Sequence, residues 1–484
     1  MQTNSDILIV GAGPVGLTLA IILQKAGVNF KIIDKKSEIT NTSNAIGVNP
    51  RSLEIWKTIG IFDQACRDGL KIKGFAFYAN NELLHYNKVD DLASEIDFFL
   101  SLPQSQTEQL LLNTLIQLGG EVIWNSELVE VTQHDNLIES KCITNQQENI
   151  IRSKWLIGCD GYHSISRNIA KIKYACHDME QHFLMFDGIV HGLDDKRDHF
   201  EANFHPHGAV LALPMNGATR LVFEISTDPK YKNVKSGTLE IFSNMLRERC
   251  NKYSIEKINW SSNFYIHECL AEKYMMGNII IVGDAAHSHS PAGGQGMNTG
   301  IQDAWNLGWK LVQIIKGYAS AKLLETYQNE RKPIANDVIR RSGLILRLAT
   351  TNNKAIQLIR NWSIKHLFNI HKIAIDIANQ LAQTDIHYET SLTDITTSFI
   401  PATKSRIVLT DMNMWQIFIV SDTDRKVTPS EIVAVKYLEQ DKIWWNNAKM
   451  CLVRPDGHIA KYADDIADIN QYFIDNDFNI SIDS

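Results

Sequence analysis

The apolar positions along the chain follow different periods, and each period predicts a different kind of element. A continuous apolar run, as in ILIV at residues 7–10, is typical of a strand buried on both faces of a parallel sheet. Polar and apolar residues alternate in ATRLVFEIS at 218–226, which predicts a strand of an antiparallel sheet. Residues 345–382 carry Ile, Leu and Ala at helical spacing. We therefore expect a parallel sheet, an antiparallel sheet and a helical segment.

The beginning of the chain reads as a strand, a glycine turn, a helix and a second strand. The turn holds Gly11, Gly13 and Gly16 in a G-x-G-x-x-G pattern, and Asp34 ends the second strand. In such a pattern the first glycine permits the tight turn, the second lets the backbone approach a pyrophosphate, and the third lets the helix lie close to the strand. The terminal acid can hydrogen-bond ribose hydroxyls. The pattern predicts a dinucleotide site without separating NAD from FAD.

The stretch IIIVGDAAHSHSPAGGQGMN at 279–298 begins as a buried strand and ends as a helix, with a glycine-rich turn between them. Asp284, at the carboxyl end of the strand, is suited to hold a chain of hydroxyls. The glycines let peptide groups lie beside a planar ring, and the helix directs its positive end at that ring, which favours an anionic reduced form. FAD has both the ribitol chain and such a ring, whereas NAD has neither. This second turn therefore predicts FAD.

Several segments together resemble the class A flavoprotein aromatic hydroxylases, which are single-component FAD monooxygenases. The resemblance implies an enzyme that uses NAD(P)H and O₂, holds oxygen as a flavin C4a-hydroperoxide and hydroxylates a phenolic or polycyclic aromatic substrate. It favours NADPH over NADH. An FAD-binding oxidoreductase or flavin-bound accessory protein without oxygen insertion is the alternative. The segments are HSPAGGQGMNTGIQDAWNLGWKL at 289–311, CDGYHSISR at 159–167, GDAAH at 283–287, LPQSQTEQLL at 102–111 and CLVRPDGHIAKY at 451–462.

The resemblance also implies which residues contact the cofactor. They comprise the pyrophosphate turn, the acid at the adenosine ribose with its neighbour, an arginine and a glutamine near the flavin, the two strand-end aspartates, and the loop beside the isoalloxazine. Asp160, in the DG motif, is linked in the family to both FAD and NAD(P)H. In chain order the set is Gly11, Gly13, Pro14, Val15, Gly16, Asp34, Lys35, Arg51, Gln104, Asp160, Asp284, Pro291, Gly294, Gln295, Gly296, Met297 and Asn298.

The chain departs from the family pattern at two places. Asn44 stands where the family usually has Arg or Lys, which removes a phosphate contact and is expected to affect FAD retention or NAD(P)H docking. After the DG motif, YACHD at 174–178 replaces a commonly found glycine. The sequence assigns no consequence to this second departure.

No catalytic side chain is assigned firmly, because the cofactor carries the chemistry and the protein positions the substrate and excludes water. His289, His205 and Phe77 are candidates for lining the cavity. Structural roles are open for each: His289 is as well explained by a structural role, His205 by a turn between two strands, and sheet packing is the commoner role for a phenylalanine. His287 is expected to be structural. No metal site is predicted, since the histidines lack metal-like context.

The fold class that follows is α/β, with a Rossmann-like FAD-binding domain and an inserted antiparallel sheet domain for the substrate. A helical segment, predicted by the helical period of residues 345–382, and a small C-terminal domain complete it. The strand patterns after Pro401 predict a small α/β unit, and the resemblance implies that this unit is thioredoxin-like. A scaffold or homodimer contact is expected of the C-terminal domain. The boundaries are 1–72, 100–180 and 270–345 for FAD, 73–99 and 181–269 for the sheet, 346–390 for the helices, and 395–484 for the last domain.

Composition limits the remaining classes of function. The net charge of −7 and the pI near 6.2 give no support for a nucleic-acid partner. The 7 cysteines form no CxxC pair, so neither zinc nor a disulfide framework is indicated, and we expect small buried thiols in a reducing compartment. No apolar run approaches the roughly 20 residues of a membrane span. A polar N-terminus leads directly into a strand, and a cytoplasmic location is therefore expected.

Overall fold

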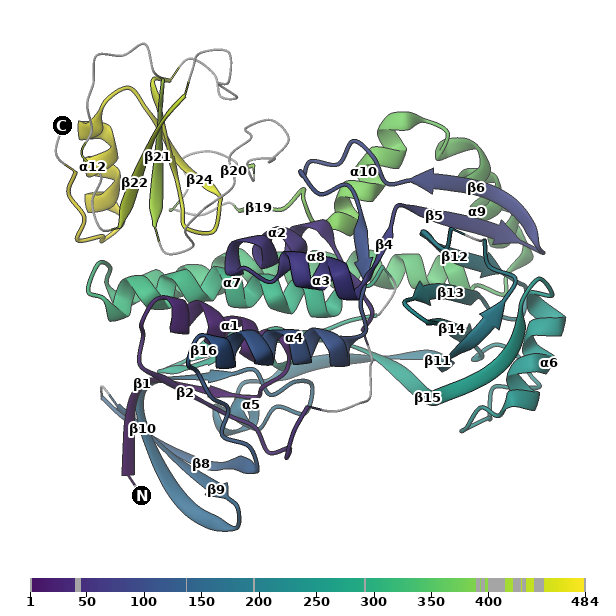
Figure 1. Cartoon of the computed structure of the whole chain (residues 1–484), viewed down its shortest axis with the longest axis horizontal. Coiled ribbons are helices and arrows are strands. Elements are labelled where there is room, and N and C mark those ends of the chain that lie inside the picture. The colour runs from purple at the N-terminus through teal and green to yellow at the C-terminus, as the bar shows by residue number, and fades with distance from the viewer. Residues whose placement is uncertain are drawn as a thin grey trace.

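The computed structural model of the chain describes residues 2–39, 45–135, 137–194, 196–290, 293–388, 392, 397–398, 414–420, 428, 432–438 and 448–482. Figure 1 shows a first sheet with helices above it, a second sheet beside it, and a small C-terminal unit. This arrangement confirms the expected α/β class. Asn44 and Pro291, both singled out in the sequence, lie outside the described residues.

The first sheet is parallel at its centre, as its apolar strands predict, and antiparallel at its edges. Its described strands follow the order β16-β17-β10-β1-β2, with β9 paired to β10 and β8 paired to β9. The central strands are in register, so that Ile9 pairs with Ile157 on one side and with Ile32 on the other. The strands are β1 (Gln2–Val10), β2 (Phe30–Ile33), β8 (Ser126–His134), β9 (Leu137–Thr144), β10 (Gln147–Gly158), β16 (Met275–Met276) and β17 (Ile279–Ile281).

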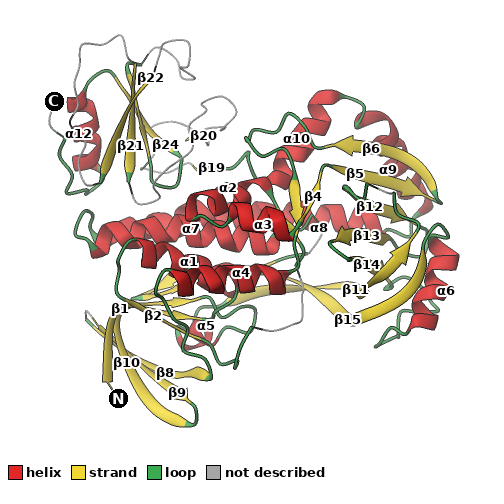
Figure 2. Ribbon diagram, in the orientation of Figure 1, coloured by secondary structure: helices red, strands yellow, loops and turns green. Residues whose placement is uncertain are grey.

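Helices cover the first sheet on one side, as Figure 2 shows for α1, α4 and α7. Helix α1 packs closely on α7, because Gly308 leaves no side chain between the helix backbone and Ile22. These elements share one hydrophobic core. The helices of this part are α1 (Pro14–Lys25), α2 (Pro50–Ile59), α3 (Phe62–Asp68), α4 (Gln104–Gln117), α5 (Ile165–Ile169) and α7 (Gly296–Ile315), and a small sheet joins β3 (Gly47–Val48), β7 (Phe99–Ser101) and β4 (Leu70–Ile72).

The second sheet has the order β18-β15-β11-β14-β13-β12-β5-β6. Its pairs are antiparallel except that β12 and β5 run parallel, because these strands come from separate stretches of chain and are not joined by a hairpin. Strands β11 and β15 run through into the first part of the molecule (Figure 1). The strands are β5 (Gly74–Ala79), β6 (Glu82–Lys88), β11 (Tyr174–His191), β12 (His199–Phe204), β13 (Val210–Met215), β14 (Ala218–Glu224), β15 (Ser254–Ala271) and β18 (His287–Ser288).

The two faces of the second sheet have different coverings. On one face Phe186 and Phe223 contact Phe242 of α6 (Leu239–Arg249). On the other face Phe183 and Met185 cluster with Leu346 of α8. This second group of helices comprises α8 (Glu325–Thr350), which follows the short helix η2 (Ala321–Leu324), α9 (Lys354–Leu367) and α10 (His371–Ala382). The expected helical segment is therefore present, although its first helix begins 21 residues before 346, at Glu325.

The C-terminal unit contains a four-stranded sheet in the order β22-β21-β23-β24, with β21 and β22 parallel and the other pairs antiparallel. Its core includes Trp415, which contacts Phe473 and Phe478 at its ring edges. Trp309 of α7 joins the same core. The elements are β21 (Trp415–Val420), β22 (Val433–Leu438), β23 (Met450–Val453), β24 (Ile459–Ala463) and α12 (Ile466–Asp475), preceded by the pair β19 (His387–Tyr388) and β20 (Thr397–Ser398).

One expectation about the cysteines was wrong. Cys176 and Cys269 form a disulfide across strands β11 and β15. The two residues are 93 positions apart, and neither lies in a recognisable cysteine pattern, so the pairing could not be derived from spacing. The other cysteines are free thiols.

Candidate functional site

The glycine turn after β1 is shaped to receive a phosphate. Gly11 has φ +103°, and a Cβ there would lie 2.4 Å from the carbonyl oxygen of Cys159. A Cβ on Gly16 would lie 1.9 Å from the carbonyl oxygen of Gly11. A Cβ on Gly13 would meet no atom within 4 Å. Helix α1 begins at Pro14 without a side-chain cap, so its N–H groups and positive end face this open space.

Asp34, the acid after β2, is hydrogen-bonded to the same turn. Asp34 accepts hydrogen bonds from the backbone N–H of Ala12 at 2.7 Å and of Lys36 at 2.9 Å, which leaves lone pairs for a ribose hydroxyl. The Lys35 side chain is exposed beside it. Val15, at the start of α1, packs against Gly283 and Gly300. The first turn and the 279–298 stretch, distant in sequence, are therefore in contact.

The DG motif lies next to both loops. Asp160 accepts a hydrogen bond from the Ser164 hydroxyl at 2.5 Å and from the backbone N–H of Ser166 at 2.9 Å, which fixes the start of α5. Arg167 donates to the carbonyl oxygen of Ala285 at 3.0 Å, and its guanidinium lies 3.8 Å from the ring centre of Tyr174. The motif is thus joined to the loop that contains Asp284.

Asp284 lies in the short helix η1 (Gly283–Ala285), at the end of β17. Asp284 is open to solvent on one side, and desolvation by the surrounding protein raises the pKa of its carboxyl. Beneath it, the fully buried Asp303 binds His287 Nε2 at 2.5 Å and Arg331 Nε at 2.6 Å. Burial alone would raise the pKa of Asp303, but His287 and Arg331 outweigh it and lower that pKa. His287 therefore has the structural role expected of it.

The loop before α7 forms a cradle with β3. Asn298 donates to the carbonyl oxygens of Gly47 at 2.9 Å and Gly294 at 2.7 Å, and it accepts from the backbone N–H of Asn49 at 3.0 Å. Gly294 has φ +65° and open space at the position of a Cβ. Helix α7 starts at Gly296 without a side-chain cap. A planar ring can therefore approach the peptide groups and the positive helix end without meeting a side chain. Gln295 and Met297 flank this point.

His289 lies directly beside this cradle. Its Nδ1 is 2.9 Å from the carbonyl oxygen of Ser290, so in the neutral ring the hydrogen sits on Nδ1 and Nε2 is an acceptor. Nε2 is buried without a hydrogen-bond partner among the described residues, and a Cβ on Gly296 would lie 3.9 Å from it. Burial lowers the pKa of His289 to about 4. The ring is therefore neutral, and its Nε2 can accept a hydrogen bond at the edge of the cradle.

The other two cavity candidates have partners that explain them. Phe77 contacts the rings of Phe204 and Phe368. His205 accepts a hydrogen bond from the backbone N–H of His207 in the turn between β12 and β13. Burial and nearby Arg249 lower the pKa of His205. Packing and turn formation, the alternatives left open by the sequence, account for the positions of both residues.

Two predicted flavin neighbours are anchored on other parts of the chain. Gln104, at the start of α4, accepts from the backbone N–H of Ala45 at 3.1 Å and donates to Glu108 at 2.9 Å. Arg51 donates to Glu54 at 3.1 Å and to the carbonyl oxygen of Asp456 at 2.9 Å. Arg51 thus joins α2, near the predicted flavin site, to the C-terminal unit.

Sequence reasoning missed residues that hold the cradle from outside. Gln383, which follows α10 in the left-handed conformation, accepts from Asn49 at 2.8 Å and from Gln302 at 2.6 Å. Its own amide donates to Thr299 at 2.9 Å. Any local signal for this position in the sequence is weak, because the residue after the helix is neither glycine nor asparagine, the types that usually adopt the left-handed conformation there.

The C-terminal unit contributes a second missed group. Arg454 donates two hydrogen bonds to Glu330, at 2.7 and 2.9 Å, and Lys310 donates to the same carboxylate at 2.8 Å. Asp456 accepts from Arg454 and from the indole N–H of Trp309. All of these charged side chains are buried. Burial alone would raise the pKa of Glu330, but Arg454 and Lys310 outweigh it and lower that pKa.

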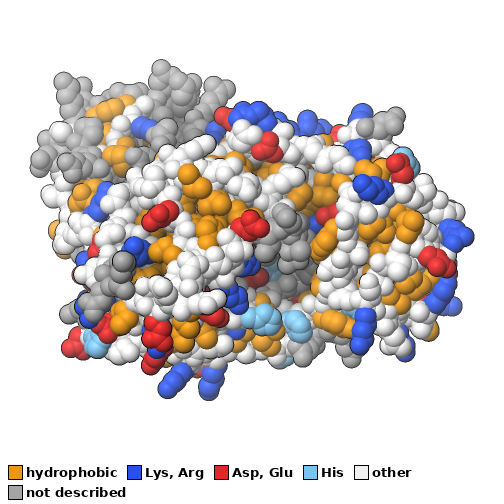
Figure 3. Space-filling view, turned by 60° about the horizontal axis from the view of Figure 1, so that its bottom comes forward, with side chains coloured by type: hydrophobic (Ala, Val, Ile, Leu, Met, Phe, Trp, Pro, Cys, Tyr) orange, Lys and Arg blue, Asp and Glu red, His pale blue; other side chains and the backbone are white. Residues whose placement is uncertain are grey.

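The space-filling view shows where these elements leave room. Figure 3 shows a hollow between the first part of the molecule and the second sheet, with acidic, basic and histidine side chains around it. Among the described residues, no group of three or more His, Cys, Asp or Glu side chains is placed to hold a metal. No helix in the described part of the chain has the length and apolar character needed to span a bilayer.

Comparison with known proteins decides the family. Residues 4–342 match the sequence model of the FAD binding domain family. The chain is a class A FAD-dependent aromatic hydroxylase. A flavin-dependent monooxygenase of Mycobacteroides abscessus is 31% identical over 348 residues, which cover 69% of this chain and 72% of the relative. An uncharacterized aromatic compound monooxygenase of Bacillus subtilis is 29% identical over 96% of this chain and 95% of the relative.

Solved structures agree on the fold of this hydroxylase family. An anhydrotetracycline hydroxylase from Streptomyces rimosus matches with a TM-score of 0.78 and 23% identity, over 99% of this chain and 100% of that chain. FAD fits these residues as the cofactor. They provide two helix N-termini without side-chain caps, glycines with open space at the position of a Cβ, and the acceptor Nε2 of His289, which has no hydrogen-bond partner among the described residues. The enzyme is an FAD-dependent monooxygenase for aromatic substrates.

Proposed function

We propose that the enzyme hydroxylates a polycyclic phenolic compound, with NADPH as the electron donor, and that the substrate ring lies between the isoalloxazine and the second sheet. The single observation that carries this placement is the position of the cradle of Asn298, Gly294 and Gly47 beside the second sheet, since a Cβ on Gly47 would lie 3.9 Å from the ring of Phe200 in β12. FAD supplies the oxygenating chemistry when it is bound. The side chains then bind, orient and keep water away.

Three groups of residues would hold FAD. The turn with Gly13 and the start of α1 would receive the pyrophosphate, because both offer N–H groups and no side chain intervenes. Asp34 would accept from the adenosine ribose, and Asp284 would accept from the ribitol chain. The start of α7 would stabilise negative charge on the isoalloxazine.

The sheet offers an apolar wall for the substrate. Leu211 and Leu213 of β13 point to the same face as Phe183 and Met185, and both leucines remain only partly buried. Such positions can contact a ligand without a change in the fold. A wall of this kind suits a large fused-ring compound, because it can bury the apolar surface of the compound without requiring polar partners.

His289 would recognise the substrate's hydroxyl or the edge of the flavin. Its neutral Nε2 can accept one hydrogen bond, and its pKa of about 4 keeps the ring neutral over the working range of pH. A phenol O–H or a ring N–H is the donor that would satisfy it. With that pKa, its role is to accept a hydrogen bond and not to remove a proton from the phenol.

Support for a polycyclic substrate comes from the extent of the match. The anhydrotetracycline hydroxylase is named for a fused-ring substrate, and its likeness includes the C-terminal unit. The strand order of that unit, with a parallel pair followed by an antiparallel pair and a helix, supports the proposal that it is thioredoxin-like. Cys451 is its only cysteine, so a dithiol reaction within it is excluded.

The test is NADPH consumption by the yellow, FAD-loaded protein with phenols, fused-ring phenols and tetracycline-like compounds. We expect a fused-ring phenol to accelerate NADPH oxidation about tenfold or more and to gain one atom from ¹⁸O₂. Parallel assays with NADH measure the preference for the 2′-phosphate, and catalase-coupled assays measure H₂O₂. Steady H₂O₂ release with every compound, and no labelled product, would favour the alternative without oxygen insertion.

A further inference from the structure

The disulfide between Cys176 and Cys269 connects the two long strands that join the halves of the molecule. The two residues are direct partners in the β11–β15 pairing, with a Cα–Cα distance of 4.1 Å. Cys176 is exposed, whereas Cys269 is 1% exposed. Cys176 lies within YACHD at 174–178, the second departure from the family pattern. The bond therefore joins an exposed residue to a buried one.

Three contacts lead from the disulfide to the loops of the cofactor site. The hydroxyl of Tyr174, two residues before Cys176, donates to the carbonyl oxygen of Asp284 at 2.9 Å. Cys269 pairs in the sheet with Ser288 of β18, which follows the Asp284 turn. The hydroxyl of Tyr162, in the DG motif, lies 4.0 Å from Cys269 Sγ. The bond therefore fixes the strands on which both loops rest.

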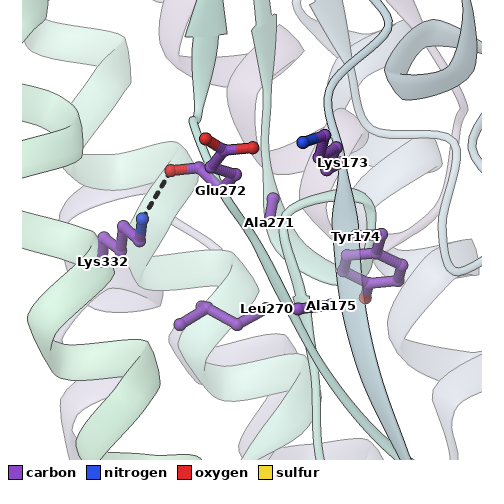
Figure 4. Close-up of a pocket in the computed structure, with 7 residues that line it drawn as sticks. All are labelled: Lys173, Tyr174, Ala175, Leu270, Ala271, Glu272 and Lys332. Atoms are coloured by element: carbon purple, nitrogen blue, oxygen red, sulfur yellow. Dashed lines mark hydrogen bonds between the residues drawn. The ribbon is translucent and has the colours of Figure 1, made fainter.

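A surface pocket of about 680 Å³ lies toward one end of the disulfide. Its lining includes Lys173, which directly precedes β11, Tyr174 and Ala175 of β11, and the residues that follow Cys269, namely Leu270, Ala271 and Glu272. Figure 4 shows Ala175 and Leu270 beside each other on neighbouring strands. Lys332 bonds to the carbonyl oxygen of Glu272, whereas Lys173 extends into solvent. A positive side chain beside an open approach favours the arrival of a thiolate.

We propose that Cys176–Cys269 is a site of thiol–disulfide exchange with a dithiol reductant. A thiolate of the reductant attacks Sγ of the exposed residue Cys176, the S–S bond breaks, and Cys269 leaves as a thiolate, to which the Tyr162 hydroxyl can donate before a proton arrives from water. The second thiol of the reductant then displaces Cys176. The protein gains two electrons and two protons, and the reductant becomes a disulfide.

Reduction weakens the hold on FAD, because it removes the covalent link between β11, which carries Tyr174, and β15, with which β18 and its Ser288 pair. This consequence rests on the proposed contact of Asp284 with the ribitol chain of FAD. A coupling at the lower end of the usual range corresponds to about a fivefold rise in the dissociation constant for FAD. Linkage is reciprocal, so bound FAD must disfavour reduction of the disulfide by the same factor.

The experiment begins with the full-length protein purified without reductant. Alkylation and peptide mass mapping should recover the linked Cys176–Cys269 peptide, and dithiothreitol should cleave it in the folded protein without urea. FAD titration by fluorescence quenching, before and after reduction, should give the rise of about fivefold. The variant C176S/C269S should bind FAD like the reduced wild type and ignore dithiothreitol. The control C66S, which alters a free thiol away from this bond, should respond like the wild type.

Several results would overturn the proposal. Free thiols at both positions in protein kept under air would remove the exchange site. Reduction that requires urea would show that Cys176 is inaccessible, and an unchanged FAD affinity after complete reduction would remove the coupling. If the double variant fails to fold, the wild-type titrations still decide. Failure of the proposed function looks different, because FAD would then bind in neither state while the mass mapping still reports on the bond.

Discussion

Replacement of Gly13 by alanine separates the fold of the dinucleotide turn from its use. The backbone at this residue has φ −77° and ψ −175°, which alanine adopts without strain. An added Cβ would meet no protein atom within 4 Å. The variant should therefore fold at least as well as the wild type, with a gain of up to about 1 kcal/mol because the unfolded chain loses freedom.

The same methyl group occupies the space proposed for the pyrophosphate. Backbone N–H groups that bond a charged oxygen contribute about 1.5–3 kcal/mol each. Displacement of the phosphates from two such groups costs about 3 kcal/mol or more, which corresponds to a dissociation constant raised about a hundredfold or more. Gly13→Ala should thus lose FAD while it keeps its stability.

The assay pairs FAD titration with thermal unfolding of the apoprotein. Gly16→Ala is the matched comparison, since its Cβ would lie 1.9 Å from the Gly11 carbonyl oxygen and must disrupt the packing of α1 on β1. We expect Gly16→Ala to lose both stability and FAD, and Gly13→Ala to lose FAD alone. A Gly13→Ala protein that binds FAD within about threefold of the wild type would refute the placement of the pyrophosphate.

Three further perturbations probe the buried polar groups. Glu330→Gln should lower the free energy of unfolding by about 3–5 kcal/mol, because it leaves buried cations unpaired. Lys322→Gln, which removes an exposed ion pair with Asp477, should change that free energy by less than about 1 kcal/mol. Equal effects of the two variants in urea denaturation would contradict this. Burial lowers the pKa of His458 to about 3, so as the pH falls below 6.5 the histidine takes up a proton in the unfolded chain before it does so in the folded protein. Between pH 6.5 and 5 the wild type should therefore lose about 2 kcal/mol more stability than His458→Gln. Parallel pH profiles of stability for the two proteins would count against this prediction. His289→Leu should raise KM for the best substrate about tenfold with a smaller change in kcat, and His289→Gln should restore part of the loss; unchanged kinetics in the leucine variant would exclude its contact with the ligand.

The parts of the site that could be predicted are those where backbone geometry admits few residue types. Gly11 and Gly16 have a steric reason within the protein for lacking a side chain, whereas Gly13 has one only toward the proposed pyrophosphate, and all three are visible in the sequence as a spacing. The strand-end aspartates Asp160 and Asp284 follow apolar runs, so their position at the edge of a parallel sheet could be expected as well. Local rules are sufficient for such features.

The parts that could not be predicted depend on contacts between distant residues. Asn49 meets Gln383 across 334 positions, and Glu330 meets Arg454 across 124. No local pattern encodes such a meeting, because each residue type is common and its partner is fixed only when the elements pack. The Cys176–Cys269 disulfide and the parallel pairing of β12 with β5 have the same origin.

The buried turn that carries Asp456 has a consequence for how this protein can be divided. The stretch that matches the FAD binding domain family ends at residue 342, yet the indoles of Trp305 and Trp309 donate to Asp456, and Lys310 shares Glu330 with Arg454. A fragment cut at that boundary would expose two tryptophans and half of an ionic cluster to water. The end of the matched stretch is therefore not a boundary of the packed core, and expression trials should keep residues 343–484.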